Sequence, residues 1–365
     1  MKRLAVIPSD PLEAYKVKGI ASRLENYYNP GKFFDEVYLL SPLEKGVRDE
    51  FGMRVIHTKD RELQKRIRDL NIDVIRAYGG NWPCDMACGY KVKGIPVVVS
   101  VHDKRPQWLH ASIKKADIVF CVSEEVKGLV LGKFDKSGRA WVLPNRVDLN
   151  VMRPFQEKEI MDLYAKYPFK YRILHVGRKS REKNLDTVIR ALKILGERYC
   201  LLAVGDGKSE EYIKLSEEQG VSERCFFLRT LANEELARYY SWADCLCNPS
   251  RSEAMSSALV EAMACGTVVV TSVPASGGVG MEHMKDGLVL EDYENPESVA
   301  EMVEKACGDS GLRTMLIGNA RESARRFEKG RVDELEISYY EKILEMKNGG
   351  EFKNGRYGFW NIFRK

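Results

Sequence analysis

Two glutamates lie inside a run of small and apolar residues, "NPSRSEAMSSALVEAMACGTVVVTS", which spans positions 248–272. Glu253 and Glu261 are eight positions apart (261 − 253 = 8). Fully buried carboxylates are rare, because burying an unpaired charge costs free energy. Glu261 therefore needs donors from which to accept hydrogen bonds, such as ribose hydroxyls. The two carboxylates indicate a binding site rather than a solvated surface.

The residues around the glutamates predict where each side chain lies. The run "ADCLCNPS" reads as a strand that ends before Pro249, so Glu253 falls in the loop beyond the carboxyl end of a strand. The following helix is predicted to start at Ser256 or Ser257 and to stop at Gly266. A capping box would place its glutamate at position 259 or 260, so this structural explanation of Glu261 fails. A solvent-facing position is disfavoured because the neighbours "SALV" and "AMACG" are small and apolar.

The elements that must position these residues repeat one theme along the chain. Short β-branched or apolar runs alternate with segments of helical period through residue 149, and the theme restarts at "RILHVG" after a polar stretch. A length of 365 residues favours two domains. We therefore predict an α/β fold with two Rossmann-like, doubly wound domains facing across a cleft. Ligands of such sheets bind beyond the carboxyl ends of the strands.

Composition excludes several classes of protein. Hydrophobic residues make up 44% and charged residues 30%, which is typical of a globular protein. The 58 basic and 53 acidic residues are spread along the chain, so no nucleic-acid partner is expected. No apolar run approaches the roughly 18 residues of a membrane helix, and the N-terminus does not read as a secretory signal. The nine cysteines match no zinc or redox motif and predict buried, reduced thiols in a cytoplasmic protein.

The motifs together resemble a known family. The E-x7-E spacing of Glu253 and Glu261, with "NPSRSE" and "LVEAMACGTVVV" around it, closely resembles the retaining glycosyltransferases of family 4, which have the GT-B fold. The resemblance extends over roughly residues 95–345 through four further stretches, "SVHD", "VLPNRVDLNVMRPF", "ILHVGRKSREKNLDTVIRAL" and "GGVGMEHMKDGLVLEDYENPESVAEMVEKA". Several ordered motifs are more specific than any one of them.

The resemblance implies a division of the chain into parts. We expect an N-terminal acceptor-side domain over residues 1–155, to which a C-terminal helix at 331–346 crosses back. Residues 156–330 would form the domain that binds the nucleotide-sugar donor. Residues 347–365 form a separate tail in which aromatic and basic residues interleave. This mixture is compatible with peripheral contact with an anionic membrane, which would favour a lipid-linked acceptor, but a frayed end or a clasp on the first domain is the favoured interpretation.

The resemblance also implies a role for each site residue. Arg178 and Lys183 would bind the diphosphate of a UDP- or GDP-sugar, and Glu261 would accept the ribose hydroxyls. Glu253 and His102 would be the catalytic residues near the transferred sugar. No Asp-x-Asp motif occurs in the sequence, so we expect no metal and no other cofactor. Taken alone, "GRKSREKN" also reads as a solvated basic loop, and a histidine at a strand end is often structural.

Three departures from the family pattern leave the substrates open. Ala254, Met255 and Ser256 form the predicted donor-sugar loop, where most relatives have Gly-Phe-Gly. The glycine pair that follows the first strand in many relatives is missing, and Arg146 replaces a usual glycine. The sugar and the acceptor, whether a glycan, a lipid-linked sugar or a polysaccharide precursor, therefore cannot be copied from a relative.

Three other functions compete with transfer. A glycoside hydrolase also uses two carboxylates, but it does not need the basic pair. A nucleotide-sugar epimerase shares the fold, and a nucleotide-sugar-binding protein would bind the donor without turnover. The E-x7-E context favours a metal-independent glycosyltransferase over all three.

Overall fold

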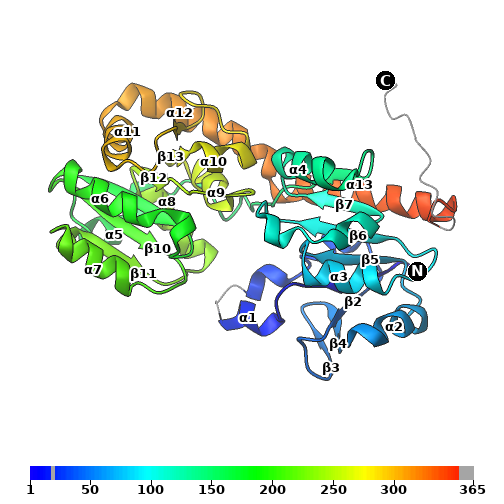
Figure 1. Ribbon diagram of the computed structural model, residues 1–365. Helices are drawn as coiled ribbons and strands as arrows, with labels where there is room; N and C mark the ends of the chain where they lie inside the picture. The colour runs from blue at the N-terminus through cyan, green and yellow to red at the C-terminus, as the bar shows by residue number, and fades with distance from the viewer. Residues whose placement is uncertain (18–20, 353–365) are drawn as a thin grey trace. The chain divides into compact units, whose positions relative to one another are not determined.

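The computed structural model describes residues 1–17 and 21–352 and divides the chain into two compact units. The first unit combines Met1–Pro144 with Gly330–Lys365, and the second is Asn145–Lys329. Each unit is built around a mainly parallel sheet flanked by helices (Figure 1). The predicted pair of doubly wound α/β domains is confirmed.

The first unit contains an eight-stranded sheet in the order β3-β4-β2-β1-β5-β6-β7-β8. All neighbouring strands are parallel except β3 and β4, which pair antiparallel. The strands are β1 Arg3–Ile7, β2 Glu36–Ser41, β3 Val47–Glu50, β4 Met53–His57, β5 Val74–Tyr78, β6 Val97–Val101, β7 Ile118–Cys121 and β8 Ala140–Val142. The helices are α1 Leu12–Val17, α2 Leu63–Asp69, α3 Trp82–Gly89, α4 Glu124–Phe134 and α13 Lys329–Asn348.

The second unit contains a six-stranded parallel sheet in the order β11-β10-β9-β12-β13-β14. Its strands are β9 Tyr171–Val176, β10 Tyr199–Val204, β11 Cys225–Leu228, β12 Cys245–Asn248, β13 Val268–Ser272 and β14 Leu288–Leu290. Its helices are α5 Met161–Lys166, α6 Leu185–Leu195, α7 Glu210–Glu218, α8 Asn233–Trp242, α9 Ser257–Cys265, α10 Val273–Ser276, α11 Pro296–Gly308 and α12 Ser310–Ala324. The strand order reverses between β9 and β12, which makes their carboxyl ends the switch point of this sheet.

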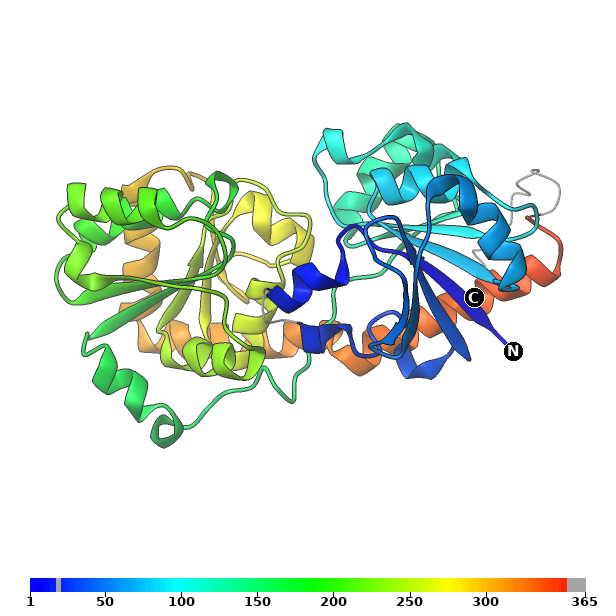
Figure 2. The ribbon, with the colours of Figure 1, turned by 90° about the horizontal axis from the view of Figure 1, so that it is seen from below.

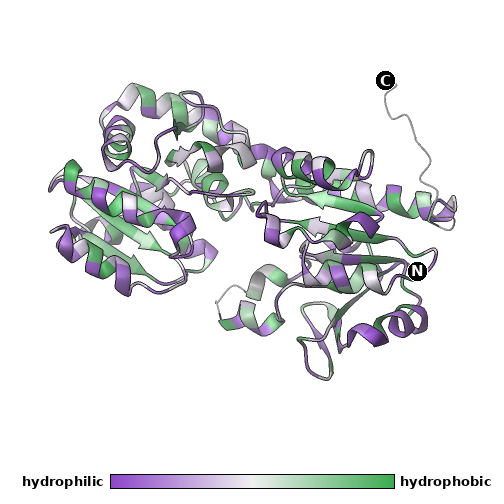
Figure 3. Cartoon of the chain, in the orientation of Figure 1, coloured by the Kyte–Doolittle hydropathy of each residue, from purple (hydrophilic) through white to green (hydrophobic). Residues whose placement is uncertain are grey.

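Each unit encloses its own apolar core, as the hydrophobic colouring of the strands in Figure 3 shows. Helix α6 illustrates how the sequence pattern builds it. Its apolar residues recur at helical spacing, and the face that they form is buried in the core of the second unit. That face consists of Leu185, Val188, Ile189, Leu192 and Leu195. All nine cysteines are buried and free, as expected from their positions in apolar strands and helices.

The structural boundary between the units differs from the predicted one. The sequence placed it after residue 155, whereas the first unit ends at Pro144. The segment between them packs on the second unit, because the Asn145 N–H contacts the Met255 sulfur at 3.2 Å and the Phe155 N–H donates to the Ser241 hydroxyl at 3.0 Å. The extended interdomain segment therefore belongs to the second unit.

Helix α13 belongs to the first unit and includes the helix expected at 331–346 (Figure 2). Its side chains enter the first core, where Glu336 and the hydroxyl of Tyr340 bind the buried guanidinium of Arg76. The predicted tail begins within this helix, since α13 runs to Asn348. Residues 353–365 of the tail lie outside the described residues.

Candidate active site

The predicted site residues of the second unit follow β9 and β12, the two strands at the switch point. Arg178 and Lys183 follow β9, and Glu253 follows β12. One side chain at the end of β12 ties the ends of the two strands together. The Asn248 amide accepts from the Val176 N–H at 3.1 Å and donates to the Val176 carbonyl at 2.7 Å. The edge that carries the site is thus fixed by polar contacts between the strand ends.

A buried asparagine fixes the loop after β9 against the loop after β12. Asn184 has a left-handed backbone with φ of 57° just before α6, and its side-chain amide donates to the carbonyls of Pro249 and Tyr293 at 2.9 and 2.8 Å. Asparagine tolerates this conformation better than most residues. The short 3-10 turn Arg181–Lys183 is thereby held directly before α6.

Two glycines let the loops at this edge approach each other closely. Gly205, which follows β10, has φ of +145°, and a Cβ atom there would lie 2.0 Å from the backbone oxygen of Gly177. A Cβ atom at Gly177 would lie 3.3 Å from the aliphatic carbons of Lys183. The lysine side chain therefore extends across the glycine that follows β9, which explains the small residues in "VGRK" and "VGDG".

Lys183 and Glu253 form an ion pair, although they are 70 positions apart in the sequence. Both side chains are largely buried, with exposed fractions of 22% and 12%. The Ser250 hydroxyl donates to the same oxygen of Glu253, Oε1, at 3.1 Å. The structure thus brings together the residue predicted to bind phosphate and the residue predicted to act on the sugar.

The remaining basic residues of "GRKSREKN" have different roles. Arg178 is exposed and makes no hydrogen bond or ion pair with any of the described residues. Lys179 is buried, and its ammonium donates to the carbonyls of Gly205 and Leu228, which close the ends of β10 and β11. Burial lowers the pKa of Lys179. Arg178 therefore fits the solvated loop that the composition indicates, whereas Lys179 does not.

Glu261 lies on α9, a helix that starts at Ser257 and ends before the left-handed Gly266 as predicted. The glutamate is buried, with 8% of its surface exposed. The hydroxyl of Tyr240 donates to Glu261 Oε2 at 2.9 Å. The sequence predicted the burial, but it gave no signal for Tyr240, which comes from the neighbouring helix α8.

The predicted donor-sugar loop is buried and closely packed. Ala254, Met255 and Ser256 are each less than 9% exposed. A Cβ atom at Gly278 would lie 2.4 Å from the carbonyl oxygen of Ala254, so only glycine allows the turn after α10 to approach this loop. The loop is thus contacted both by that turn and by Asn145, whose N–H contacts the Met255 sulfur.

His102 lies in the first unit, directly after β6, and its ring is exposed. The ring stacks on that of Tyr78, with centroids 6.2 Å apart and planes inclined by 7°. The histidine therefore stands at the carboxyl edge of the first sheet, as predicted. Its catalytic role stays a prediction.

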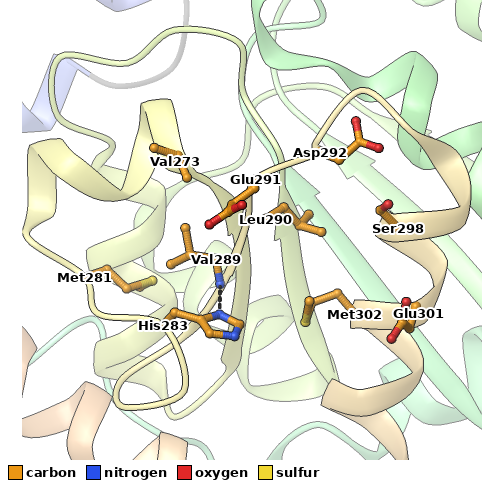
Figure 4. Close-up of a pocket in the computed structure, with 10 residues that line it drawn as sticks. All are labelled: Val273, Met281, His283, Val289, Leu290, Glu291, Asp292, Ser298, Glu301 and Met302. Atoms are coloured by element: carbon orange, nitrogen blue, oxygen red, sulfur yellow. Dashed lines mark hydrogen bonds between the residues drawn. The ribbon is translucent and has the colours of Figure 1, made fainter.

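A pocket of about 450 Å³ lies elsewhere in the second unit, beyond the carboxyl ends of β13 and β14 (Figure 4). Val273, Met281 and Met302 give it apolar walls, and Glu291 and Glu301 add carboxylates. His283 Nδ1 accepts from the Val289 N–H at 3.0 Å. None of the predicted site residues lines this pocket, which is therefore separate from the edge of β9 and β12.

In residues 1–17 and 21–352, no helix is both long and apolar enough to cross a membrane. The same residues contain no group of three or more His, Cys, Asp or Glu side chains that could hold a metal ion.

Comparison with known proteins finds two families, one for each part of the chain. Residues 156–323 match the glycosyl transferases group 1, and residues 30–151 match glycosyltransferase family 4. D-inositol 3-phosphate glycosyltransferase of Xylanimonas cellulosilytica is 29% identical over 225 residues, which is 58% of this chain and 53% of that protein. An uncharacterized glycosyltransferase of Methanocaldococcus jannaschii is 29% identical over 48% of this chain and 45% of its own length. The aligned part of the chain thus spans about half the length of these curated relatives.

Solved structures resemble almost the whole chain. Sucrose-phosphate synthase from Thermosynechococcus elongatus has a TM-score of 0.76 at 17% identity. The match covers 94% of this chain and 100% of the synthase chain. HepE of Anabaena, solved with UDP and glucose, has the same TM-score at 16% identity and the same coverage. At this identity the likeness shows the fold, which is GT-B. The two family matches, which cover residues 30–151 and 156–323, assign the chain to the glycosyltransferases of family 4.

Proposed function

We propose that this protein is a retaining glycosyltransferase that moves a sugar from a nucleoside diphosphate sugar to a hydroxyl acceptor without a bound metal ion. The observation that carries the proposal is the ion pair of Lys183 with Glu253 at the switch point of the second sheet. This pair supports the proposal, since a cation that would bind a diphosphate lies beside a carboxylate that would bind a sugar. Glu261, buried on the next helix, supplies a further acceptor.

The chemistry requires positive charge at the leaving group. Negative charge develops on the diphosphate as the glycosidic bond breaks, and fixed cations stabilise it. Lys183 supplies a point charge, and the exposed guanidinium of Arg178 can bind two phosphate oxygens. In this proposal the two side chains take the place of a metal ion.

The carboxylates would act on the sugars of the donor. Glu253 would accept hydroxyls of the transferred sugar and favour the positive charge of an oxocarbenium-like transition state. Glu261 would accept the ribose hydroxyls. The acceptor would attack from the face of the leaving group, and a phosphate oxygen would take its proton, so that the anomeric configuration is retained. No nucleophile from the protein is required.

The acceptor side belongs to the first unit in this proposal. His102, at the end of β6, would bind a sugar hydroxyl or orient the acceptor. A lipid-linked acceptor and contact of the tail with an anionic membrane are part of the same proposal. Pelleting with anionic vesicles tests that contact, and equal pelleting of the full chain and a chain ending at residue 352 would contradict it.

A thermal-shift panel in excess EDTA tests the donor site. UDP is the first probe, because HepE of Anabaena was solved with UDP and with UDP-glucose, and GDP, ADP and TDP complete the panel. A ligand at 100 times its dissociation constant adds about 2.7 kcal/mol to stability. A shift with one diphosphate supports the proposal and names the base for a transfer assay. No shift with any of them, with or without chelator, would contradict it.

A lysine variant links that shift to the proposed site. Lys183→Ala should weaken diphosphate binding about tenfold or more, because a bond between charged groups is lost. Lys193→Ala is the matched control, since Lys193 is exposed on the adjoining helix α6. Titration of both variants by calorimetry is the measurement. Equal affinity in the parent and Lys183→Ala would show that the phosphates bind elsewhere.

A further inference from the structure

We propose that Tyr240 is a positioning residue for ribose recognition, because its hydroxyl fixes the orientation of the Glu261 carboxylate. The inference deepens the proposed function and rests on the assignment of Glu261 to the ribose. It adds a residue that lies outside the E-x7-E motif and comes from a different helix.

Both residues of this contact are buried. The Tyr240 hydroxyl donates to Glu261 Oε2 at 2.9 Å, and the residues are 0% and 8% exposed. A hydrogen bond to an ionised acceptor is stronger than a neutral one, and a low dielectric strengthens it further. One oxygen of the carboxylate is therefore held at a defined place by the protein.

Tyr240 is itself held in register with the helix that carries Glu261. The Thr267 hydroxyl donates to the Tyr240 carbonyl at 2.6 Å, and the Thr267 N–H donates to the Ala262 carbonyl at 3.0 Å. Thr267 directly follows Gly266, the residue that ends α9. One residue thus ties the end of α8 to the end of α9, which holds in register the backbones that carry the tyrosine and the glutamate.

A fixed carboxylate would recognise a ribose better than a rotating one. The 2′ and 3′ hydroxyls of a ribose present two neighbouring donors, which require acceptors in a set direction. Orienting the acceptor in advance removes an ordering cost from binding. Without the tyrosine hydroxyl, the carboxylate loses the donor that holds Oε2. Binding of the ribose hydroxyls should then weaken, whereas contacts with the diphosphate should persist.

The test compares Tyr240→Phe with a matched control, Tyr239→Phe. Tyr239 is the adjacent residue on α8 and is also buried, but its hydroxyl is hydrogen-bonded with Tyr167. Both variants lose one buried hydroxyl. Calorimetry gives the dissociation constants of UDP and 2′-deoxy-UDP, and of GDP and 2′-deoxy-GDP. The readout is the dissociation constant of the 2′-deoxy nucleotide divided by that of the ribose nucleotide, because a merely structural defect weakens the binding of both ligands alike.

The parent and Tyr239→Phe should favour the ribose nucleotide by about tenfold, the size of one good hydrogen bond to a charged group. Tyr240→Phe should reduce that ratio to about threefold or less. A ratio in Tyr240→Phe as large as that of the parent would overturn the role of Tyr240 and leave the ribose assignment intact. A ratio near one in a parent that binds both nucleotides would show that Glu261 does not read the 2′ hydroxyl, and both the assignment and this inference would fail.

A second variant keeps the proposal testable if Tyr240→Phe does not fold. Thr267→Val keeps the side-chain shape and removes the hydroxyl that holds the Tyr240 carbonyl. It should lower the ratio less than Tyr240→Phe does, because the tyrosine hydroxyl remains. An unchanged ratio in a folded Thr267→Val protein would count against the proposal.

Discussion

At the scale of single residues, the pairing of Lys183 with Glu253 gives each side chain a second role. The ammonium that is proposed to bind the diphosphate is already bound to the carboxylate that is proposed to bind the sugar. A phosphate must therefore compete with Glu253 for the lysine. Each charge of the pair compensates the other, which lowers the free-energy cost of burying most of both side chains.

Glu253→Gln should tighten the binding of a nucleoside diphosphate severalfold, because the amide competes less well than a carboxylate for the Lys183 ammonium. The same variant should lose most transfer activity and bind the complete nucleotide sugar less tightly relative to the diphosphate. Calorimetric titration with UDP and UDP-glucose, and with their GDP counterparts, measures both effects. Weaker diphosphate binding in this variant would show that Glu253 supports the phosphate site and does not compete for it.

Sequence reasoning at this scale succeeded where the pattern is local. The apolar neighbours of Glu261 predicted its burial, and Gly266 predicted where α9 ends. It missed Tyr240, because the partner of a buried carboxylate 21 residues away depends on how two helices pack. Sequence reasoning also treated the basic residues of "GRKSREKN" as alike. In the structure Lys179 is buried and donates to the carbonyls at the ends of two strands, whereas Arg178 is exposed.

At the scale of elements, the close approach of two loops depends on glycine. Gly205→Ala should destabilise the second unit by about 2 kcal/mol or more, since its positive φ and the 2.0 Å approach to Gly177 leave no room for a methyl group. Thermal or urea unfolding measures the change.

The control for this substitution has the opposite expected sign. Gly318 lies inside helix α12, and a Cβ atom there would meet nothing within 4 Å. Gly318→Ala should stabilise the protein by about 0.5 to 1 kcal/mol, because alanine loses less backbone entropy in a helix. Equal stability of Gly205→Ala and the parent would mean that the two loops can separate without cost.

The sequence predicted most strands of both sheets, because buried parallel strands are continuous apolar runs. It missed β3 and β14, which are the outermost strands of their sheets. β3 reads "VRDE" and is half exposed, so its pairing with β4 and not its composition makes it a strand. β14 has only three residues, which is too short for a periodic signal.

At the scale of the whole molecule, the predicted site residues are divided between the two units. His102 belongs to the first, and Arg178, Lys183, Glu253 and Glu261 belong to the second. A transferase of this fold needs both units folded. The first unit is completed by α13, which returns to it from the end of the second, so its stability depends on residues far apart in the sequence.

The contact that secures α13 is a buried charge pair. Arg76 on β5 and Glu336 on α13 are 2% and 0% exposed, and the guanidinium also donates to the Ser100 hydroxyl at 2.9 Å and to the Tyr340 hydroxyl at 2.8 Å. Removing one partner of such a pair leaves the other charge buried and uncompensated. Glu336→Gln should therefore destabilise the first unit by about 3 to 5 kcal/mol.

The control is Glu334→Gln, which changes an exposed glutamate on the same helix and should leave stability within about 0.5 kcal/mol of the parent. Tryptophan fluorescence follows unfolding. Protection of the amides in β5 and β6 from hydrogen exchange reports on the first unit alone.

Diphosphate affinity should survive in Glu336→Gln under conditions where the second unit stays folded, while transfer falls with the folded fraction of the first. Loss of both together would mean that the second unit does not fold independently of the first. Unchanged exchange in β5 would show that the hydroxyl contacts compensate for the lost charge.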